Sequence, residues 1–218
     1  IIFLYDYFNI KSALCRQGNR GMVMQNDKNG GDEIRLSSKI LNEVLEWVES
    51  FVFAVFVVIL IFIFVFRNVV VEGPSMNSTL SDGDRLIIYH LNYKPQRGDI
   101  IVLNSVGLGK TIIKRCIGVG GDTVRIDYSD SSVTVNGEKL DEDYIDEEMT
   151  VLPGFDTQYL KDDVFEYQVP EGKLFVMGDN RNHSTDSRSY FVGFVDESDV
   201  LGKAIFRILP FSGFGKIG

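Results

Sequence analysis

The feature that most constrains this chain is an unbroken run of sixteen apolar residues, from Phe51 to Phe66. The run is slightly shorter than the roughly 17–25 residues of a membrane-spanning helix. Trp47-Val48 before it and Val69 to Val71 after it add apolar length. A buried core helix is the alternative, but the rest of the chain offers nothing comparable to pack around a helix that is apolar on every side. We therefore expect a transmembrane helix over residues 46–66.

Residues 1–45 carry mixed charge, Gly-rich pieces and little periodicity, so we expect mostly disorder there. From Leu36 to Val48, however, apolar residues recur at helical spacing, which predicts a helix leading into the membrane. No small-x-small cleavage site follows the apolar run, which argues against a removable signal peptide. The chain opens with Ile, and either Met22 or Met24 could be the natural start.

Charge limits the classes of partner. The formal net charge is -9 and the sequence pI is about 4.8, which argues against nucleic acid, since phosphate contacts need clustered Lys and Arg. The same negative charge disfavours adhesion to anionic lipid, so attachment to a membrane must come from the apolar run. The charges do not orient it: Arg35 and Lys39 on one flank balance Arg67 and Arg85 on the other.

Residues 67–218 form the second part of the chain, and their pattern predicts a mainly β domain. Short β-type runs are separated by Gly or Asp-Gly, which is typical of a mostly antiparallel sheet or partial barrel. Val133 to Leu140 predicts a hairpin, because its Asn136-Gly137 pair suits a type I′ turn. The predicted strands are 86–89, 99–103, 111–119, 123–126, 174–177 and 204–208.

Two further features have structural interpretations. Cys15 and Cys116 lie on opposite sides of the apolar run, so we predict no disulfide between them. Cys116 could be a nucleophile, but its apolar neighbours favour a buried thiol. The segment 141–148 holds six acidic residues; it lacks the ligand spacing and turn glycine of a calcium loop, which favours a solvated loop over a cation site.

Catalytic chemistry is indicated at two positions. Ser75 lies in a Gly-Pro turn shortly after the predicted anchor. Lys114 lies between apolar neighbours in a predicted strand, on the same face as Ile112 and Cys116. Burial disfavours the ammonium form and lowers a lysine pKa, so Lys114 is a candidate general base. Neither residue is specific alone: serines are common in such turns, and a strand lysine often reaches water.

A third polar stretch, Gly178 to Arg188, follows the apolar run 174–177. Its concentration of charged and polar side chains needs a network of ion pairs and hydrogen bonds to be ordered. By composition alone it could equally be an exposed loop.

Together these stretches resemble the bacterial type I signal peptidases, membrane-bound Ser/Lys proteases, in their short Gram-positive-like form. The resemblance covers about residues 47–210, and the motifs occur in the family's order. They are Ser75-Met76-x-x-Thr79-Leu80, Arg97-Gly98-Asp99-Ile100-Ile101-Val102, Ile113-Lys114-Arg115 with Gly118 and Gly121-Asp122, and Gly178-Asp179-Asn180-Arg181 with Ser184, Asp186, Ser187 and Arg188.

The resemblance implies a role for each matching residue. Ser75 would attack the scissile carbonyl, Lys114 would remove its proton, and the Ser75 N–H would donate to the oxyanion. Ser184 would orient the lysine amine. Two ion pairs would brace the site: Asp186 with Arg188, and Arg115 with Asp179. No cofactor or metal is implied.

The sequence departs from the family pattern at three turn positions. Gly73 stands where some members carry a serine that donates a second hydrogen bond to the oxyanion. Ser78 and Gly120 stand where proline is usual or frequent. These changes leave the role residues intact but reduce the expected rigidity of the turns.

The resemblance also implies the substrate and the location. The substrates would be exported preproteins, whose signal peptides place an extended cleavage site at the outer membrane surface. Such a segment would add as a strand to the enzyme's sheet. The N-terminus would then be cytoplasmic and residues 67–218 extracytoplasmic.

Three alternatives remain open. A Ser-His-Asp hydrolase could use Ser75, His183 and Asp186. A self-cleaving Ser/Lys repressor shares the chemistry but carries a DNA-binding domain in place of the anchor. A catalytically silent, membrane-tethered β domain would need the Ser75/Lys114 pair to be accidental.

Overall fold

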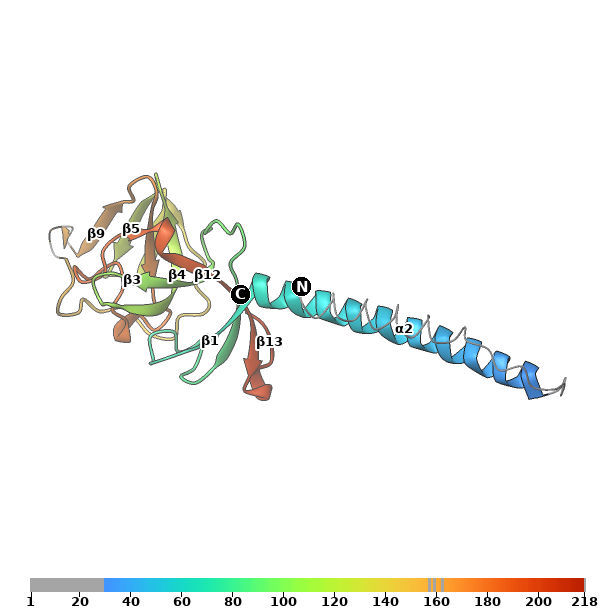
Figure 1. Cartoon of the computed structure of the whole chain (residues 1–218). Coiled ribbons are helices and arrows are strands. Elements are labelled where there is room, and N and C mark those ends of the chain that lie inside the picture. The colour runs from blue at the N-terminus through green and yellow to red at the C-terminus, as the bar shows by residue number, and fades with distance from the viewer. Residues whose placement is uncertain (1–29, 157, 159, 162, 218) are drawn as a thin grey trace. The chain divides into compact units, whose positions relative to one another are not determined.

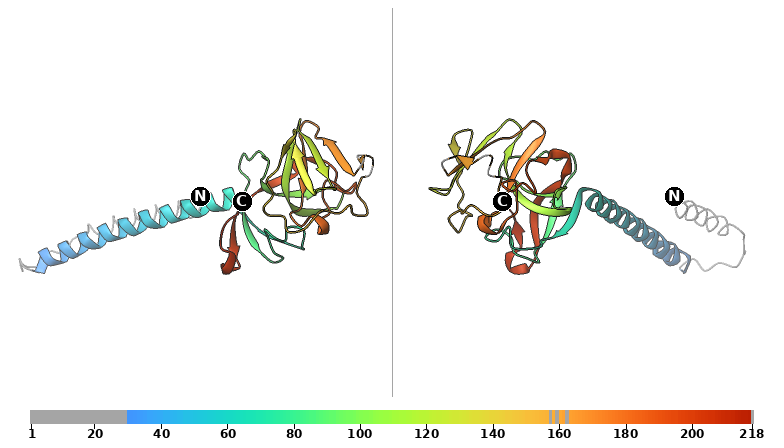
Figure 2. Two further views of the ribbon diagram at one scale, coloured as in Figure 1. Left: turned by 180° about the vertical axis from the view of Figure 1, so that it is seen from behind. Right: turned by 90° about the vertical axis from the view of Figure 1, so that its left-hand side faces the viewer.

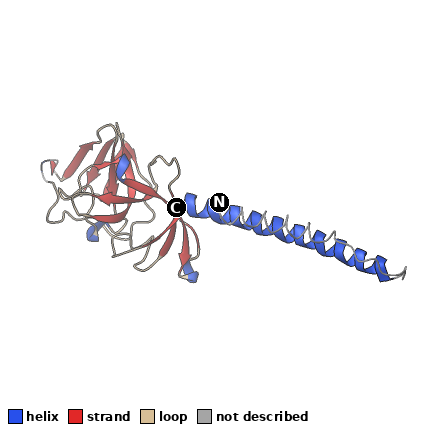
Figure 3. Cartoon of the chain, viewed as in Figure 1, coloured by secondary structure: helices blue, strands red, loops and turns tan. Residues whose placement is uncertain are grey.

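The computed structural model describes residues 30–156, 158, 160–161 and 163–217. It divides into two compact units, 1–57 and 58–218. The first contains most of helix α2 (Gly30–Val65), and the second contains the end of that helix and the strands. Figure 3 shows helix α2 and, in the second unit, strands, loops and short helical turns.

Helix α2 contains a stretch, Leu41–Val65, that is long and apolar enough to cross a membrane. None of the most apolar part of this stretch is buried against protein, which disfavours the core-helix alternative. The helix begins at Gly30, six residues before the predicted start and within a segment expected to be mostly disordered. Residues 1–29, the rest of that prediction, lie outside the described part of the chain.

The described strands form two antiparallel sheets, which the two views of Figure 2 show from different sides. The larger has the order β1-β2-β12-β3-β4-β10-β11, with β13 paired to β12, and the smaller has the order β7-β6-β5-β9-β8. The mainly β, antiparallel fold class is therefore confirmed. The strands are β1 (Phe66–Val70), β2 (Arg85–Tyr89), β3 (Ile100–Ser105), β4 (Lys110–Val119), β5 (Thr123–Asp127), β6 (Ser132–Val135), β7 (Glu138–Lys139), β8 (Leu160–Lys161), β9 (Val164–Gln168), β10 (Lys173–Met177), β11 (Val195–Asp196), β12 (Val200–Leu209) and β13 (Gly215–Lys216).

The predicted hairpin is confirmed. Strands β6 and β7 pair with Val135 opposite Glu138. Asn136 and Gly137 between them have φ values of 54° and 83°, and positive φ at both central residues is what a type I′ turn requires.

Strand β4 is more deeply buried than its sequence predicted. Instead of one covered face, residues 112–118 are buried without interruption. Strand β3 covers one edge of β4 from Lys110 to Arg115 (both strands are labelled in Figure 1), and β10 covers the other edge only between Arg115 and Val119. The other edge of Lys110–Lys114 therefore has no strand partner in the described part of the chain.

Three clusters of buried apolar side chains support the site. One lies beneath the smaller sheet around Phe165 and Tyr167, and another contains Met76 and Leu80 with parts of β2 and β3. The third contains Ile112 and Cys116 on either side of Lys114. Cys116 is a free, fully buried thiol whose pKa is raised to about 12 by burial, so the buried-thiol interpretation is confirmed. Cys15 lies outside the described residues.

Candidate active site

The turn that carries Ser75 is fixed from both sides of the serine. Gly73 has a φ of 84°, a value that glycine adopts without strain, and its N–H donates to Asp82 Oδ1 at 2.7 Å. After the serine, the side chains of Met76 and Leu80 are each 1% exposed and pack into one apolar cluster. Buried side chains thus anchor the turn, while Ser75 itself stays partly accessible.

Lys114 meets Ser75 directly. Lys114 belongs to the buried part of β4 and is only 3% exposed. Its Nζ lies 2.6 Å from Ser75 Oγ. Nζ also donates a hydrogen bond to the carbonyl oxygen of Ile113 at 3.0 Å. The structure thus brings together two side chains 39 residues apart in the sequence.

The surroundings of Lys114 destabilise its protonated form relative to that of an exposed lysine. Burial is the main cause and lowers its pKa to about 8, with the charge of Lys110 acting in the same direction. The carboxylate of Asp186 opposes the shift without cancelling it. At neutral pH a useful fraction of the amine is therefore unprotonated and can accept the Ser75 proton across the existing contact.

Arg115 and Asp179 form a second, tightly bonded group beside this pair. Arg115 Nε and Nη2 donate to the two oxygens of Asp179 at 2.9 and 2.7 Å. Burial alone would lower the pKa of Arg115, but the hydrogen bonds and charge of Asp179 raise it. Asp179 also accepts a hydrogen bond from Thr79 Oγ1 at 2.6 Å. One carboxylate therefore connects the Ser75 turn to β4.

Asp186 and Arg188 form a fully buried ion pair inside the polar loop. Arg188 Nε and Nη2 donate to the Asp186 carboxylate at 2.8 and 2.9 Å, and both side chains are 0% exposed. Burial by itself would raise the pKa of Asp186, but the charge and hydrogen bonds of Arg188 outweigh burial and lower it. Arg188 also donates to the carbonyl of Arg181, and Asp186 accepts from the N–H of Gly178. The loop is therefore an ordered network and not an exposed segment.

Ser184 lies close to Ser75 and Lys114 but does not make the contact with the lysine amine that the resemblance implied. Among the described residues no hydrogen bond joins its hydroxyl to Lys114; the amine bonds the Ile113 carbonyl instead. Gly178 has no room for a side chain, because an added Cβ would fall 2.3 Å from Ser184 Oγ and 2.4 Å from Ser75 O. Ser184 therefore lies close to the backbone of the nucleophile turn.

Sequence reasoning gave no role to Asn180, yet this residue makes two contacts with the nucleophile turn. Its side-chain Nδ2 donates to the carbonyl of Pro74, and its backbone N–H donates to the carbonyl of Ser75, both at 3.1 Å. The motif contained Asn180 but gave no sign of these contacts, because they depend on how two distant turns pack.

The acidic segment 141–148 is only partly the solvated loop that its composition favoured. Glu142 pairs with the buried guanidinium of Arg181, and the Tyr144 ring lies 4.0 Å from the guanidinium carbon of Arg115. Glu142 and Tyr144 thus contact arginines of the motifs that carry the resemblance. The remaining acidic side chains are mostly exposed.

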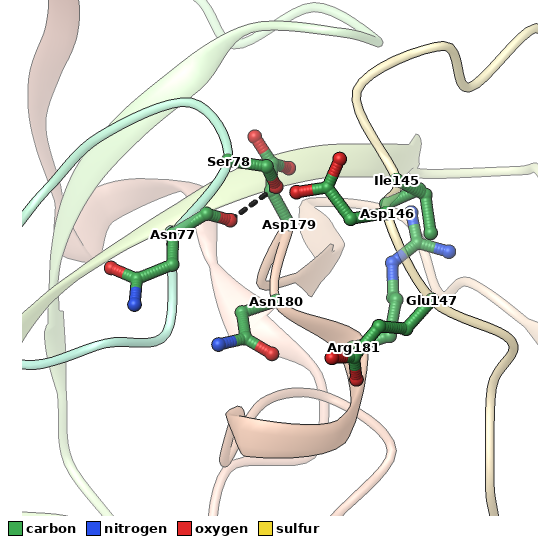
Figure 4. A pocket seen from close by; sticks show the side chains of 8 residues that line it. All are labelled: Asn77, Ser78, Ile145, Asp146, Glu147, Asp179, Asn180 and Arg181. Carbon is green, nitrogen blue, oxygen red and sulfur yellow. Dashed lines mark hydrogen bonds between the residues drawn. The ribbon is translucent and has the colours of Figure 1, made fainter.

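A small polar pocket lies between this segment, the Ser75 turn and the start of the polar loop (Figure 4). Asp146 and Glu147 come from the acidic segment, and Asn77 and Ser78 come from the turn. Ser78 has a φ of 84°, which a proline ring could not adopt. The turn here therefore differs from one that carries proline at this position.

His183 does not occupy the position that a Ser-His-Asp triad requires. It is exposed on a short 3₁₀ turn, η2 (Arg181–His183), and its Nδ1 lies 3.1 Å from Asn180 Oδ1. Among the described groups it has no hydrogen bond to Ser75 or Asp186. The geometry therefore disfavours the triad alternative.

The comparisons with known proteins agree on one family. The family model described as "Signal peptidase, peptidase S26" matches residues 44–209. Signal peptidase I of Bacillus licheniformis is 38% identical over 178 residues, which covers 80% of this chain and 94% of the relative. Signal peptidase I T of Bacillus subtilis (strain 168) is 36% identical over 192 residues, covering 87% and 97%.

A solved structure gives a further match. The crystal structure of a signal peptidase I from Enterococcus faecalis V583 is 36% identical in sequence. The alignment covers 51% of this chain and 97% of that chain, with a TM-score of 0.40.

Proposed function

The chain belongs to the peptidase S26 family of signal peptidases, and on that basis we propose that it removes N-terminal signal peptides with Ser75 as nucleophile and Lys114 as general base. The observation that carries this assignment is the 2.6 Å contact between Lys114 Nζ and Ser75 Oγ. This is within the distance at which a base can take a nucleophile's proton. A catalytically silent β domain would need this contact, and the lowered pKa of Lys114, to serve no purpose.

The reaction follows from that geometry. Ser75 Oγ attacks the scissile carbonyl carbon while its proton moves to the neutral amine of Lys114. The resulting oxyanion accepts a hydrogen bond from the Ser75 N–H. Lys114, now an ammonium, donates its proton to the leaving amine, the C–N bond breaks, and an ester to Ser75 remains.

The second half of the reaction repeats these steps with water as the nucleophile and Ser75 as the leaving group. Lys114 takes a proton from a water molecule, whose oxygen attacks the ester carbonyl. Breakdown of this second intermediate releases the signal peptide as a carboxylate and returns the proton to Ser75. The cycle consumes only water.

The substrate would bind as an added strand. The edge of β4 over Lys110–Lys114 is left uncovered by β10, and it leads directly to the base. An extended peptide paired there would place alternate side chains on the same face of the sheet. The first and third residues before the cut would then face the enzyme together, and small side chains would suit both positions.

The apolar stretch Leu41–Val65 supports one membrane anchor within the described part of the chain. We assign residues 1–45 to the cytoplasm and residues 67–218 to the outer side, where exported preproteins present their cleavage sites. Preproteins and the lipid bilayer are then the partners of this chain.

Substitution of the dyad tests the assignment. Ser75→Ala and Lys114→Ala should each abolish cleavage of a purified signal-bearing precursor by the full chain in detergent micelles. Lys114→Arg should be equally inactive, because guanidinium keeps the charge but does not act as a base. Cleavage is followed by the appearance of the mature product on gels.

His183→Ala is the control and should keep most of the activity. Substantial cleavage by Lys114→Arg would exclude Lys114 as the proton acceptor. Loss of turnover in a folded His183→Ala variant would instead revive the triad alternative.

A further inference from the structure

The peptide bond between Pro74 and Ser75 is held by its carbonyl oxygen. That oxygen accepts two hydrogen bonds, from the N–H of Asn77 at 3.0 Å and from Asn180 Nδ2 at 3.1 Å. The bond is trans, and a trans peptide is planar, with its carbonyl and N–H pointing in opposite directions. Fixing the Pro74 carbonyl therefore fixes the direction of the Ser75 N–H.

The Ser75 N–H itself is unused within the described part of the chain: no described group accepts a hydrogen bond from it. The next peptide is also held, because the backbone N–H of Asn180 donates to the Ser75 carbonyl at 3.1 Å. Gly178 packs against the same carbonyl oxygen. Asn180 thus contacts the carbonyl on each side of the serine nitrogen and leaves that nitrogen's hydrogen available.

The orientation of the Asn180 side chain follows from its partner at Pro74. A backbone carbonyl oxygen can only accept a hydrogen bond, so the amide nitrogen of Asn180 must face it. Asn180 therefore presents a donor, and not an acceptor, to the Pro74 carbonyl.

We propose that Asn180 is a positioning residue that aims the Ser75 N–H at the developing oxyanion. This inference rests on the proposed function, in which that N–H stabilises the tetrahedral intermediates. Gly73 supplies no side-chain donor near the turn, so the direction of the backbone donor carries more weight in this chain. A hydrogen bond to the Pro74 oxygen also polarises the peptide and strengthens its N–H as a donor.

The proposal predicts an effect on the chemical step alone. Asn180→Ala should lower kcat by roughly 10- to 100-fold, because an oxyanion donor that is removed or misdirected costs about that much or more. KM should stay within about threefold, since the oxyanion exists only after substrate has bound. The pH dependence of kcat should not move, because Asn180 makes no hydrogen bond to Lys114.

Asn182→Ala is the matched control. Asn182 is the same residue type two positions along, but its side chain bonds Thr150 and the carbonyl of Glu148, away from the nucleophile turn. Its kcat should remain within about threefold of the unsubstituted chain. Asn180→Asp is the second test variant: it keeps the size of the side chain but replaces the donor by an acceptor oxygen, and its kcat should fall at least as far as that of Asn180→Ala.

The measurements are kcat, KM and the pH profile for the full chain in detergent with a signal-bearing precursor, together with a thermal unfolding curve for each variant. Unchanged kcat in a folded Asn180→Asp overturns the proposal. So does a rise in KM alone, which would make Asn180 a substrate contact. A shifted pH profile in Asn180→Ala, which adds no charge, would also overturn it by placing the effect on Lys114. Unfolding of both variants overturns it too, by assigning Asn180 to stability.

Failure here is distinguishable from failure of the proposed function. If Ser75→Ala is inactive while both Asn180 variants turn over normally, only the positioning role falls. If Ser75→Ala itself cleaves the precursor, the dyad assignment falls with it.

Discussion

Lys114 shows how one residue acquires a chemical property from its surroundings. A lysine on the surface would be fully protonated at neutral pH, whereas burial in β4 lowers the pKa of this one to about 8. Its apolar neighbours in the sequence already predicted the direction of that shift. The contact with Ser75 Oγ at 2.6 Å depends on two segments 39 residues apart, which a local pattern does not specify.

The lowered pKa predicts a pH dependence for cleavage. Only the neutral amine accepts a proton, so kcat/KM should rise with pH through about 8 and level off above it. At pH 7 about a tenth of the enzyme would carry the base form. The measurement is kcat/KM from pH 6 to 10 with a precursor that has no groups titrating near the cleavage site. A profile that is flat between pH 7 and 9 would contradict the assignment of Lys114 as the base.

Contacts between distant loops could not be predicted from the sequence. Asn180 and Ser184 belong to the same motif, and the resemblance gave a role to Ser184 only. In the structure Asn180 bonds the nucleophile turn, while the hydroxyl of Ser184 makes no hydrogen bond to the lysine among the described groups. The difference arises because a motif fixes residue types and order, whereas the packing of two distant turns decides which side chain reaches which carbonyl.

At the scale of elements, most of the sheet could be predicted. Short β-type runs and turn glycines located most of the longer strands, and the Asn136-Gly137 turn fixed one hairpin with its geometry. Strands β1 and β9, of five residues each, were not predicted. The short strands β7, β8, β11 and β13 contain two residues each, too few to show a period. The double-sided burial of β4 was missed because it depends on which elements cover each face of the sheet.

The polar loop 178–188 depends on its buried ion pair, so Asp186→Asn should destabilise the domain strongly. The variant leaves the Arg188 guanidinium buried without its counter-charge, which typically costs about 3–5 kcal/mol. Asp196→Asn is the matched control: Asp196 pairs with Lys173 at the surface, with side chains 51% and 35% exposed, and should cost at most about 1 kcal/mol. Urea unfolding of both variants in the same detergent gives the comparison. Equal losses would show that the Asp186–Arg188 pair does not support the fold.

At the scale of the whole chain, charge leaves the orientation of the anchor undecided, and the substrate decides it. If signal peptides are cut after export, residues 67–218 must lie outside. Protease added to intact spheroplasts should then digest the C-terminal unit and spare a tag placed at the N-terminus. Inside-out vesicles should give the opposite pattern. Protection of residues 67–218 in spheroplasts would rule out the proposed topology.

The link that Asp179 makes between Thr79 and Arg115 has a consequence for substrate choice. It ties the serine's turn to the strand of the base, so contacts within the chain hold Lys114 Nζ 2.6 Å from Ser75 Oγ. Because these contacts come from the protein alone, assembly of the reacting pair does not distinguish one polypeptide from another. Discrimination then falls to the free edge of β4, where an extended segment would pair.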